Sequence, residues 1–308
     1  MIPVFSGRHV EAAVSPMRAL DAVREAFIAY ARGEWTMPPK VYVPAYPAGD
    51  FRAMPALGAG HALLKWVTSF PGNPSQGLPT VTGLVLLSDA SNGVLVAAFD
   101  AAAVTALRTG AAAVLAAEAL GCDGDTAVVG AGVNGRSVAR TLVARGRRTL
   151  LFDVDAARAQ AVADDLGAEA VSREEALAAD VVVTVTPARE PVFGAGSLHP
   201  GQHVSLMGAD GPGKAEIAVE EMARVHVFCD DWEQASHNGD LAHAVEAGAL
   251  SRADVTQLGD VLAGTANGRR AEDEITVFDS TGLAIQDLAI ALAAVERADD
   301  LDVPRVEV

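Results

Sequence analysis

The stretch TAVVGAGVNG, residues 126–135, decides the fold of this chain. Its first half predicts a short buried strand, and its glycines, Gly130, Gly132 and Gly135, follow the spacing G-x-G-x-x-G. The segment NGRSVARTLVARG (134–146) then predicts a helix. A glycine-rich turn between a strand and a helix lets the backbone approach a pyrophosphate, and the helix N-terminus donates N–H groups to it. The stretch therefore predicts a Rossmann dinucleotide-binding domain.

The next predicted strand, RTLLFD (148–153), ends in an acidic residue. Asp153 follows Gly135 by 18 residues, which is close to the spacing of the carboxylate that binds the ribose hydroxyls of a dinucleotide. A carboxylate at this place repels a 2′-phosphate, so we expect NAD to be preferred over NADP. Arg136, at the start of the helix, is a nearby cation that could bind such a phosphate, but we expect it to face the pyrophosphate.

Apolar runs alternate with helical segments through the rest of this region. Such alternation predicts a parallel, doubly wound sheet. We therefore assign residues 120–283 to the Rossmann domain. The further strands expected in it are DVVVTVTP (180–187), QHVSLMG (202–208), VHVFCD (225–230) and ITVFDSTG (275–282).

The segment before the motif has a different pattern. Within residues 15–35 the apolar residues follow helical spacing, and a helix is expected there with Ser15 as its N-cap and Gly33 as its stop. Short β-rich runs follow, and SDASNG (88–93) predicts a hairpin turn between two of them. This pattern indicates a helix packed on a largely antiparallel sheet.

The two halves together predict an α/β protein with two domains. A long Ala-rich helix over residues 101–121 leads into the Rossmann domain. The last helix, over residues 283–298, is expected to return to the first domain. We therefore expect an N-terminal α+β domain over residues 1–119, completed by residues 284–308.

The composition excludes several classes of protein. With 23 Lys and Arg against 40 Asp and Glu, the net charge is −17, which disfavours binding to nucleic acid or to anionic membranes. We expect no membrane span, because no apolar run reaches about 18 residues. We also expect no metal site, because no histidine pairs with Cys or a carboxylate at a ligand spacing. Two distant cysteines, Cys122 and Cys229, and the expected absence of a signal peptide favour the cytoplasm.

A second glycine-rich stretch, GADGPGK (208–214), fits the spacing of a phosphate-binding P-loop. We interpret this match as accidental. Ala215 stands where a P-loop needs Ser or Thr for Mg²⁺, and Pro212 lacks the N–H that a phosphate cradle uses. Asp210 follows a strand that should end at the cofactor crevice, where a carboxylate could act as an acid or base. The alternative is a turn residue that caps its own loop.

Four cations before the dinucleotide motif are candidates for binding a substrate. Lys65 lies inside an apolar run, where a charge is unfavourable without a partner, and Arg108 lies in the Ala-rich helix. Lys40 and Arg52 occur in shorter mixed segments. Several cations around one cleft would bind a carboxylate substrate. The alternative for each is a solvated or salt-bridged surface residue.

Taken in order, eight segments resemble the ornithine cyclodeaminase/mu-crystallin family over nearly the whole chain. The resemblance implies a homodimer formed through the N-terminal domain, with a nicotinamide cofactor in the Rossmann domain. The segments are MPPK (37–40), AMPAL (53–57), LKWVTSFPGNP (64–74), GLPTVTGLVLLSD (77–89), ALRTGAA (106–112), GAGVNG (130–135), GADGPGKAE (208–216) and ITVFDSTGLAIQD (275–287).

The resemblance also implies roles for individual residues. Lys65 and Arg108 would hold the substrate carboxylate, assisted by Lys40, and Lys65 would take part in catalysis. Asp210 would be the acid or base, and Arg52 would contact the substrate. Cofactor contacts beyond Gly130, Gly132, Gly135 and Asp153 would come from Thr109, Val133, Asn134, Thr186, Lys214, Asp279 and Ser280.

The predicted function is NAD(H)-dependent hydride transfer at the Cα of a small amino acid or its imine, as in the dehydrogenase and ketimine reductase branch of the family. One alternative is an ornithine cyclodeaminase, which recycles NAD and releases ammonia. Such enzymes usually carry an acidic residue at the position of Arg52, to bind a distal amine, and usually Arg at the position of Lys40. Arg52 instead suits a small amino acid, a second carboxylate or a cyclic imine. Another alternative is a non-catalytic NAD(P)H-dependent binding protein, a branch that tends to lack the Asp found here as Asp210.

Overall fold

A computed structural model of the 308-residue chain describes residues 1–209, 211 and 213–307. The chain divides into two compact units, Met1–Arg108 with Leu283–Val308, and Thr109–Gly282. We call them the N-terminal unit and the Rossmann unit. The division falls inside the Ala-rich helix α3 (Ala101–Leu120), whereas the sequence suggested residue 119, at the end of that helix.

The N-terminal unit contains a seven-stranded sheet in the order β15-β1-β6-β5-β4-β3-β2. Only the β1–β6 pair is parallel, so the sheet is largely antiparallel, as the sequence predicted. The strands are β1 (Ile2–Phe5), β2 (Val41–Ala45), β3 (Gly49–Gly58), β4 (His61–Ser69), β5 (Val81–Asp89), β6 (Leu95–Asp100) and β15 (Arg305–Val306).

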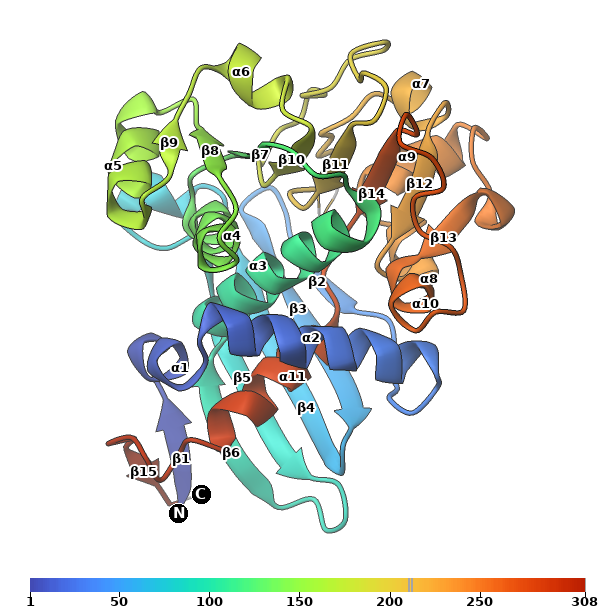
Figure 1. Cartoon of the computed structure of the whole chain (residues 1–308). Coiled ribbons are helices and arrows are strands. Elements are labelled where there is room, and N and C mark those ends of the chain that lie inside the picture. The colour runs from blue at the N-terminus through green and yellow to red at the C-terminus, as the bar shows by residue number, and fades with distance from the viewer. Residues whose placement is uncertain (210, 212, 308) are drawn as a thin grey trace. The chain divides into compact units, whose positions relative to one another are not determined.

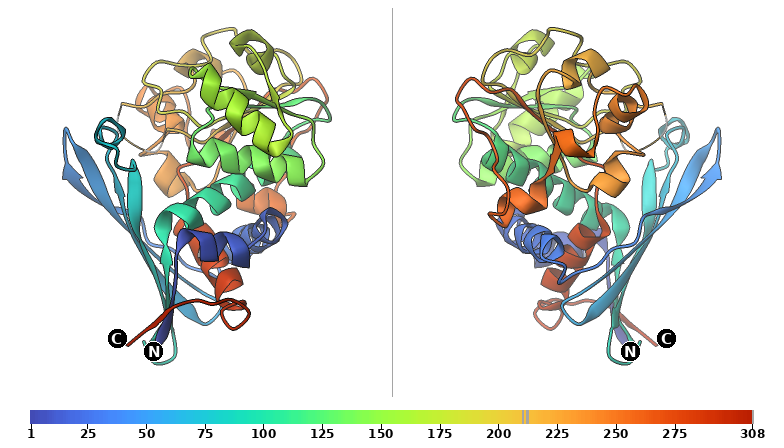
Figure 2. Two further views of the ribbon diagram at one scale, coloured as in Figure 1. Left: turned by 90° about the vertical axis from the view of Figure 1, so that its left-hand side faces the viewer. Right: turned by 90° about the vertical axis from the view of Figure 1, so that its right-hand side faces the viewer.

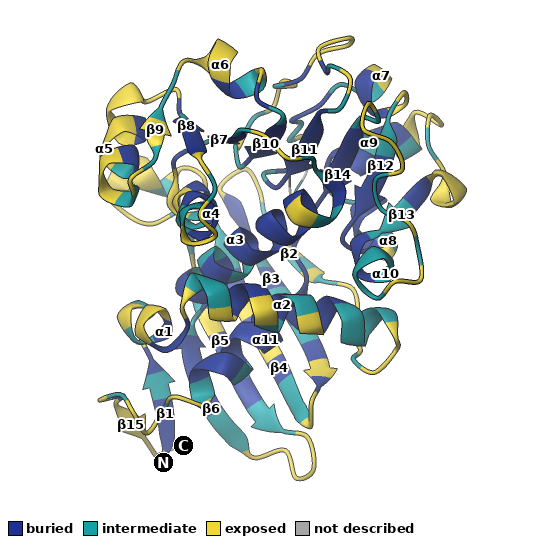
Figure 3. Cartoon of the chain, in the orientation of Figure 1, coloured by how far each residue is buried: buried dark blue, intermediate teal, exposed yellow. Residues whose placement is uncertain are grey.

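Two long helices cover one face of this sheet (Figure 1). Helix α11 (Ala284–Val295) packs on β3, β4 and β5, and α2 (Pro16–Ala31) packs on α11. Because α11 lies between α2 and the sheet, it is buried on nearly every side (Figure 3). The Ser15 hydroxyl caps α2 by accepting the Arg18 N–H, as expected. The unit also contains α1 (Gly7–Ala13), the 3-10 helix η1 (Asn73–Gln76) and the first part of α3.

Strand β3 was not predicted from the sequence, because FRAMPAL contains a proline that disfavours a strand interior. The structure accommodates it where β2 has already ended. Strand β2 pairs with β3 only as far as Ala53, and the next bridge on that side joins Thr36 to Leu57. Pro55 lies between these pairings, so its missing N–H removes no ladder bond on that side.

The face of the sheet opposite α2 and α11 is apolar and exposed. On β4 the side chains alternate, with Leu63, Lys65 and Val67 buried and Leu64 and Trp66 exposed. Within the described residues of the N-terminal unit, no helix covers this face (Figure 2). We call it the outer sheet face, and its exposed large apolar side chains are Val41, Val43, Leu57, Leu64, Trp66 and Leu84.

The Rossmann unit contains an eight-stranded sheet, and all its strand pairs are parallel. The order is β13-β12-β14-β11-β10-β7-β8-β9, so the winding reverses between β7 and β10. The strands are β7 (Thr126–Val129), β8 (Thr149–Phe152), β9 (Glu169–Ala170), β10 (Val181–Thr184), β11 (His203–Leu206), β12 (His226–Cys229), β13 (Val255–Gln257) and β14 (Thr276–Asp279).

Helices α4 and α5 lie side by side on β7 and β8 (Figures 1 and 2). The central strands β7, β10, β11 and β14 are buried along their whole length, which explains their continuous apolar runs. The helices of this unit are α4 (Val133–Ala144), α5 (Ala156–Leu166), α6 (Arg173–Leu177), α7 (Val219–Met222), α8 (Trp232–Ala235), α9 (Asp240–Glu246), α10 (Leu258–Leu262), the 3-10 helix η2 (Arg252–Asp254) and the second part of α3.

Helix α3 corrects one expectation. By length and composition alone it could cross a membrane, although the sequence suggested that no apolar run was long enough. Most of the helix is buried inside the protein, and the core helix of a soluble protein passes the same test. The finding is therefore weak evidence for a membrane span.

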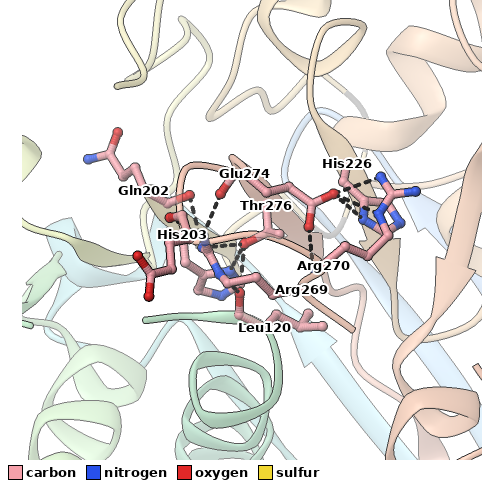
Figure 4. Close-up of polar contacts among 9 residues, drawn as sticks. Leu120, Gln202, His203, His226, Arg269, Arg270, Glu274 and Thr276 are labelled. Atoms are coloured by element: carbon pink, nitrogen blue, oxygen red, sulfur yellow. Dashed lines mark hydrogen bonds and ion pairs between the residues drawn. The ribbon is translucent and has the colours of Figure 1, made fainter. Parts of the chain in front are cut away.

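The amino-terminal ends of the parallel strands are closed by a buried polar network (Figure 4). The Thr276 hydroxyl donates to Leu120 O and accepts from Arg269, so the Nδ1 of His203, 2.9 Å from Thr276 Oγ1, must donate to it. His203 Nε2 then accepts from Ser205 Oγ at 2.9 Å. Burial, together with the Arg269 charge, lowers the pKa of His203 to about 3. This histidine is therefore a neutral structural residue, at the strand ends opposite the glycine-rich loop.

Candidate active site

Two glycines of the loop between β7 and α4 are required by the backbone itself. Gly130 has a φ of +108°, and a Cβ there would lie 2.7 Å from Val185 O. A Cβ on Gly135 would lie only 1.7 Å from Gly130 O. A side chain at either position would therefore force the turn apart.

Gly132 is different, because nothing in the chain requires it to be glycine. It is the N-cap of α4 with an ordinary φ of −71°, and beyond its two chain neighbours no atom of the described residues lies within 4 Å of the place where its Cβ would be. Val133 next to it is exposed, and Asn134 is half-buried. An open approach to the N-terminus of a 12-residue helix is what a pyrophosphate needs, so these residues fit a dinucleotide.

Asp153 follows β8 and holds the same loop from the side. Its Oδ2 accepts the Ala131 N–H at 2.7 Å, and its Oδ1 accepts the Asp155 N–H at 2.8 Å. The carboxylate therefore lies at the glycine-rich loop, as the sequence predicted. The expectation for Arg136 differs from what is seen, because its guanidinium donates to Asp165 of α5 at 2.6 and 2.9 Å.

A buried glutamate connects the loops that follow β10 and β11. Glu216 Oε1 accepts both the N–H and the hydroxyl of Thr186, at 2.9 and 2.7 Å, and its Oε2 accepts the Gly208 N–H at 2.8 Å. Burial raises the pKa of Glu216. Lys214, in the same loop, donates from Nζ to Gly208 O at 3.2 Å. Asp210, the expected acid or base, lies outside the described residues.

The residues after β14 are also buried. Asp279 Oδ2 accepts the Leu241 N–H at 2.9 Å, and the Ser280 hydroxyl donates to Asp230 Oδ2 at 2.9 Å. Burial raises the pKa of Asp279 well above its usual range, and the charge of Asp240 raises it further. Thr186, Asp279 and Ser280 thus lie at the carboxyl ends of the parallel strands, the edge at which ligands bind in such sheets.

In the N-terminal unit, two of the predicted cations share one carboxylate. Lys65 Nζ lies 2.9 Å from Asp287 Oδ1, and Arg108 Nε lies 3.8 Å from the same oxygen. Lys65 and Asp287 are almost completely buried. Burial lowers the pKa of Lys65 to about 8, against the raising effect of Asp287 and with the lowering effect of Arg108. The lysine is thus held in an environment that disfavours its charge.

This group has hydrogen-bonding capacity left over. Gln286 is adjacent to the group, since Arg108 Nη1 lies 3.5 Å from its Oε1. Two buried donors, Arg108 Nε and Gln286 Nε2, and one acceptor, Asp287 Oδ2, have no hydrogen-bond partner in the part of the chain that the structure describes. Buried polar atoms are normally paired, so unsatisfied donors beside two cations indicate a polar ligand. Thr109 Oγ1, in the Rossmann unit, is another buried atom without a partner among the described residues.

Arg52 lies on β3, which pairs with β4, the strand that carries Lys65. Its guanidinium donates to both oxygens of Asp50, from Nε at 2.6 Å and from Nη2 at 3.2 Å, and lies 5.3 Å from the centre of the Tyr42 ring. Lys40 is half-buried immediately before β2. The structure thus brings Lys65 and Arg108 to one carboxylate and gives Arg52 a carboxylate of its own.

Sequence reasoning missed three of these residues. Asp287 is a single charge inside the apolar segment LAIQDLAIALAAV, and that contrast was a usable signal of a buried partner. Asp50 is two residues from Arg52, so in a strand the two share a face, but β3 had not been recognised. Glu216 is the last residue of the segment GADGPGKAE, and nothing in its neighbouring sequence indicated a buried carboxylate.

Comparison with known proteins identifies the family of this chain. The model of the ornithine cyclodeaminase/mu-crystallin family matches residues 4–301. An alanine dehydrogenase of Archaeoglobus fulgidus is 41% identical over 311 residues, covering 96% of this chain and 94% of that protein. The solved structure of an archaeal alanine dehydrogenase dimer with bound NAD has a TM-score of 0.92 and 40% identity, covering 99% of this chain and 98% of that one.

A second solved structure is more distant in sequence and equally similar in fold. It is the Δ1-pyrroline-2-carboxylate reductase of Thermococcus litoralis in complex with NADH and L-proline, at 27% identity and a TM-score of 0.92, covering 99% of this chain and 100% of that one. The family expected from the sequence motifs is confirmed: this chain belongs to the ornithine cyclodeaminase/mu-crystallin family.

Proposed function

We propose that the protein is an NAD(H)-dependent oxidoreductase that transfers a hydride at the Cα of a small amino acid or its imine. The observation that carries this proposal is the Lys65–Asp287–Arg108 group, with unsatisfied buried donors on Arg108 and on the adjacent Gln286, in a chain that also holds an open glycine-rich dinucleotide loop. The domain over residues 1–119 and 284–308 would hold the substrate, and residues 120–283 would hold the cofactor.

The basic residues and Asp210 have different tasks in the proposed reaction. Lys65 and Arg108, assisted by Lys40, bind the substrate carboxylate and thereby fix the position of its Cα. Bound NAD⁺ supplies the acceptor for the hydride lost from Cα, and the amino acid becomes an imine with loss of one proton. Asp210 handles that proton and the water that converts the imine to a 2-oxo acid and ammonia. In the opposite direction the same groups serve imine reduction.

The cofactor contacts in this proposal lie at one edge of the Rossmann sheet. Gly132 and the first N–H groups of α4 bind the pyrophosphate, and Asp153 binds the ribose. The remaining contacts are proposed from Thr109, Val133, Asn134, Thr186, Lys214, Asp279 and Ser280.

NADH should bind at least about tenfold more tightly than NADPH, a difference of roughly 1.4 kcal/mol. The reason is that Asp153 lies where it repels a 2′-phosphate, and the next residue, Val154, is exposed and offers no charge. Arg158 is 3.9 Å from Asp153 but forms its closer pair with Asp155, at 3.0 Å. Fluorescence titration of the two reduced cofactors measures the ratio. Equal or tighter binding of NADPH would contradict the prediction and indicate that Arg158 turns toward the phosphate.

We also propose a homodimer formed through the outer sheet face. The exposed apolar side chains there, including Trp66 stacked on Phe51 at 5.7 Å, are the kind of surface that a partner covers. We expect an interface well above ~2,000 Å², in the range of obligate dimers. Light scattering at micromolar concentration should give twice the 31.6 kDa of one chain. A mass of 31.6 kDa would refute the dimer.

The test of the function is a panel of amino acids with NAD⁺, followed at the absorbance of NADH and by an ammonia assay. We expect net NADH with at least one small amino acid. Ammonia without net NADH would instead indicate a cyclodeaminase, and tight NADH binding without either product would indicate a binding protein. The two free cysteines, Cys122 and Cys229, support our proposal that the enzyme works in the cytoplasm.

A further inference from the structure

The ion pair between Asp50 and Arg52 has no task in the reaction described above. Both residues lie on β3, two positions apart, so both side chains point to the face covered by α11. Both are buried, at 6% and 7% exposure, and the pair is bidentate. A two-point contact holds the guanidinium in one orientation.

This ion pair belongs to the same site as Lys65. In the register of β3 and β4, Met54 lies opposite Lys65 and Arg52 lies opposite Val67, so Arg52 and Lys65 are diagonal neighbours on one face. The charge of Arg52 is close enough to lower the pKa of Lys65. A substrate carboxylate held by Lys65 and Arg108 therefore has Arg52 in its immediate surroundings.

The basic side chains of this site outnumber the carboxylates that pair with them, and this imbalance favours an anionic ligand. Arg52 is paired with Asp50, whereas Lys65 and Arg108, within the described part of the chain, share Asp287. Lys65 and Arg108 thus bring two positive charges to one carboxylate, which leaves one positive charge of this pair to be matched. A buried charge is unfavourable until it is paired, so the site is complementary to a ligand that brings one negative charge.

We propose that Asp50 is a specificity-determining residue: by neutralising Arg52 it makes the site select amino or imino acids with a single carboxylate and an uncharged side chain. This inference rests on the proposed function. A second carboxylate on the substrate would have to displace Asp50 from Arg52 and would leave Asp50 buried without its partner. A second ammonium would meet the guanidinium.

L-asparagine and L-aspartate are the probes, because they have the same shape and differ in one charge. Their kcat/KM values, or their inhibition constants against the best substrate found, measure the preference. The wild-type enzyme should favour asparagine over aspartate. In Asp50→Asn the guanidinium loses the charge of this carboxylate, and the ratio should shift toward aspartate by about tenfold or more, as for a charge-assisted contact to carboxylate.

The double variant Asp50→Asn with Arg52→Met is the matched control. It removes both charges of the pair, so the ratio of kcat/KM values should return to a preference for asparagine, whatever the absolute activity. Because it leaves no buried unpaired charge, it is also the variant that should fold if Asp50→Asn does not.

Two results would overturn the inference while leaving the proposed function intact. One is a wild-type enzyme that is active but favours aspartate, and the other is an Asp50→Asn variant whose ratio is unchanged. A double variant that keeps the shift toward aspartate would also overturn it, since Asp50 would then not act through Arg52. Absence of NADH formation with every amino acid would instead refute the proposed function, and this inference with it.

Discussion

Replacing Lys65 with methionine should lower kcat/KM by about 10²–10³-fold or more, because it removes a charge-assisted contact to the substrate carboxylate and with it the placement of Cα. Methionine has nearly the volume of lysine and needs no hydrogen-bond partner in this buried position. NADH binding should be unchanged, because the residues proposed to contact the cofactor belong to the Rossmann unit. Steady-state kinetics on the best substrate and a cofactor titration measure the two effects separately.

The matched control is Leu63→Met, on the same strand and the same buried face, where a volume-conserving exchange is tolerated. Lys65→Met should lose some stability, since Asp287 then keeps only Arg108, at 3.8 Å. Both variants are therefore compared at a temperature at which circular dichroism shows them folded. A kcat/KM within tenfold of wild type would mean that the carboxylate is held elsewhere.

The pH dependence separates a binding role for Lys65 from a purely structural one. The pKa of Lys65 is lowered to about 8, mainly by burial and also by the charges of Arg108 and Arg52, while Asp287 opposes the shift. Lys65 is therefore charged below pH 8 and loses its charge above it. In the direction of reduction, KM for a 2-oxo acid should rise above about pH 8 in the wild-type enzyme, whereas in Lys65→Met it should be high at every pH.

The Rossmann unit was predictable from the sequence because its signals are local. The strand, the three glycines and Asp153 lie within 28 residues, from Thr126 to Asp153, and a parallel sheet buried on both faces produces strands that are apolar throughout. The carboxyl ends of such strands meet at one edge, so residues far apart in sequence could be assigned to one site. Burial of the Asp279 side chain and the Ser280–Asp230 contact could not be predicted, since they depend on how the loops fold over that edge.

The N-terminal unit was harder because its contacts are between distant segments. Lys65 and Arg108 stood out as charges in apolar surroundings, but their partner Asp287 lies 222 residues from Lys65 along the chain. Strand β3 was missed because a proline argues against a strand unless the neighbouring strand is known to end before it. Without β3, the shared face of Asp50 and Arg52 cannot be seen from the sequence, so their ion pair could not be predicted.

Replacing Gly132 with alanine should weaken NADH binding by about 10–100-fold, or roughly 1.4–2.8 kcal/mol, while leaving the fold unchanged. The φ of −71° is ordinary for alanine, and beyond its two chain neighbours no atom of the described residues lies within 4 Å of the added methyl group. The added methyl group would instead occupy the space through which the pyrophosphate must approach the N-terminus of α4. Thermal melting without cofactor should show only the small loss of stability expected when alanine replaces glycine at an N-cap, and a fluorescence titration measures the loss of affinity.

Two other glycines serve as controls for Gly132→Ala. They distinguish a loss of the cofactor site from a general effect of replacing a glycine. Gly194 also has nothing within 4 Å of its missing Cβ and no positive φ, so Gly194→Ala should leave both stability and NADH affinity unchanged. Gly135→Ala places a methyl group 1.7 Å from Gly130 O and should damage the loop itself, lowering stability as well as affinity. If Gly132→Ala bound NADH as tightly as Gly194→Ala, the pyrophosphate would not lie at this helix. Beyond its two chain neighbours, the added methyl group meets no atom of the described protein within 4 Å, so a loss of affinity in Gly132→Ala alone would place the cofactor at the N-terminus of α4.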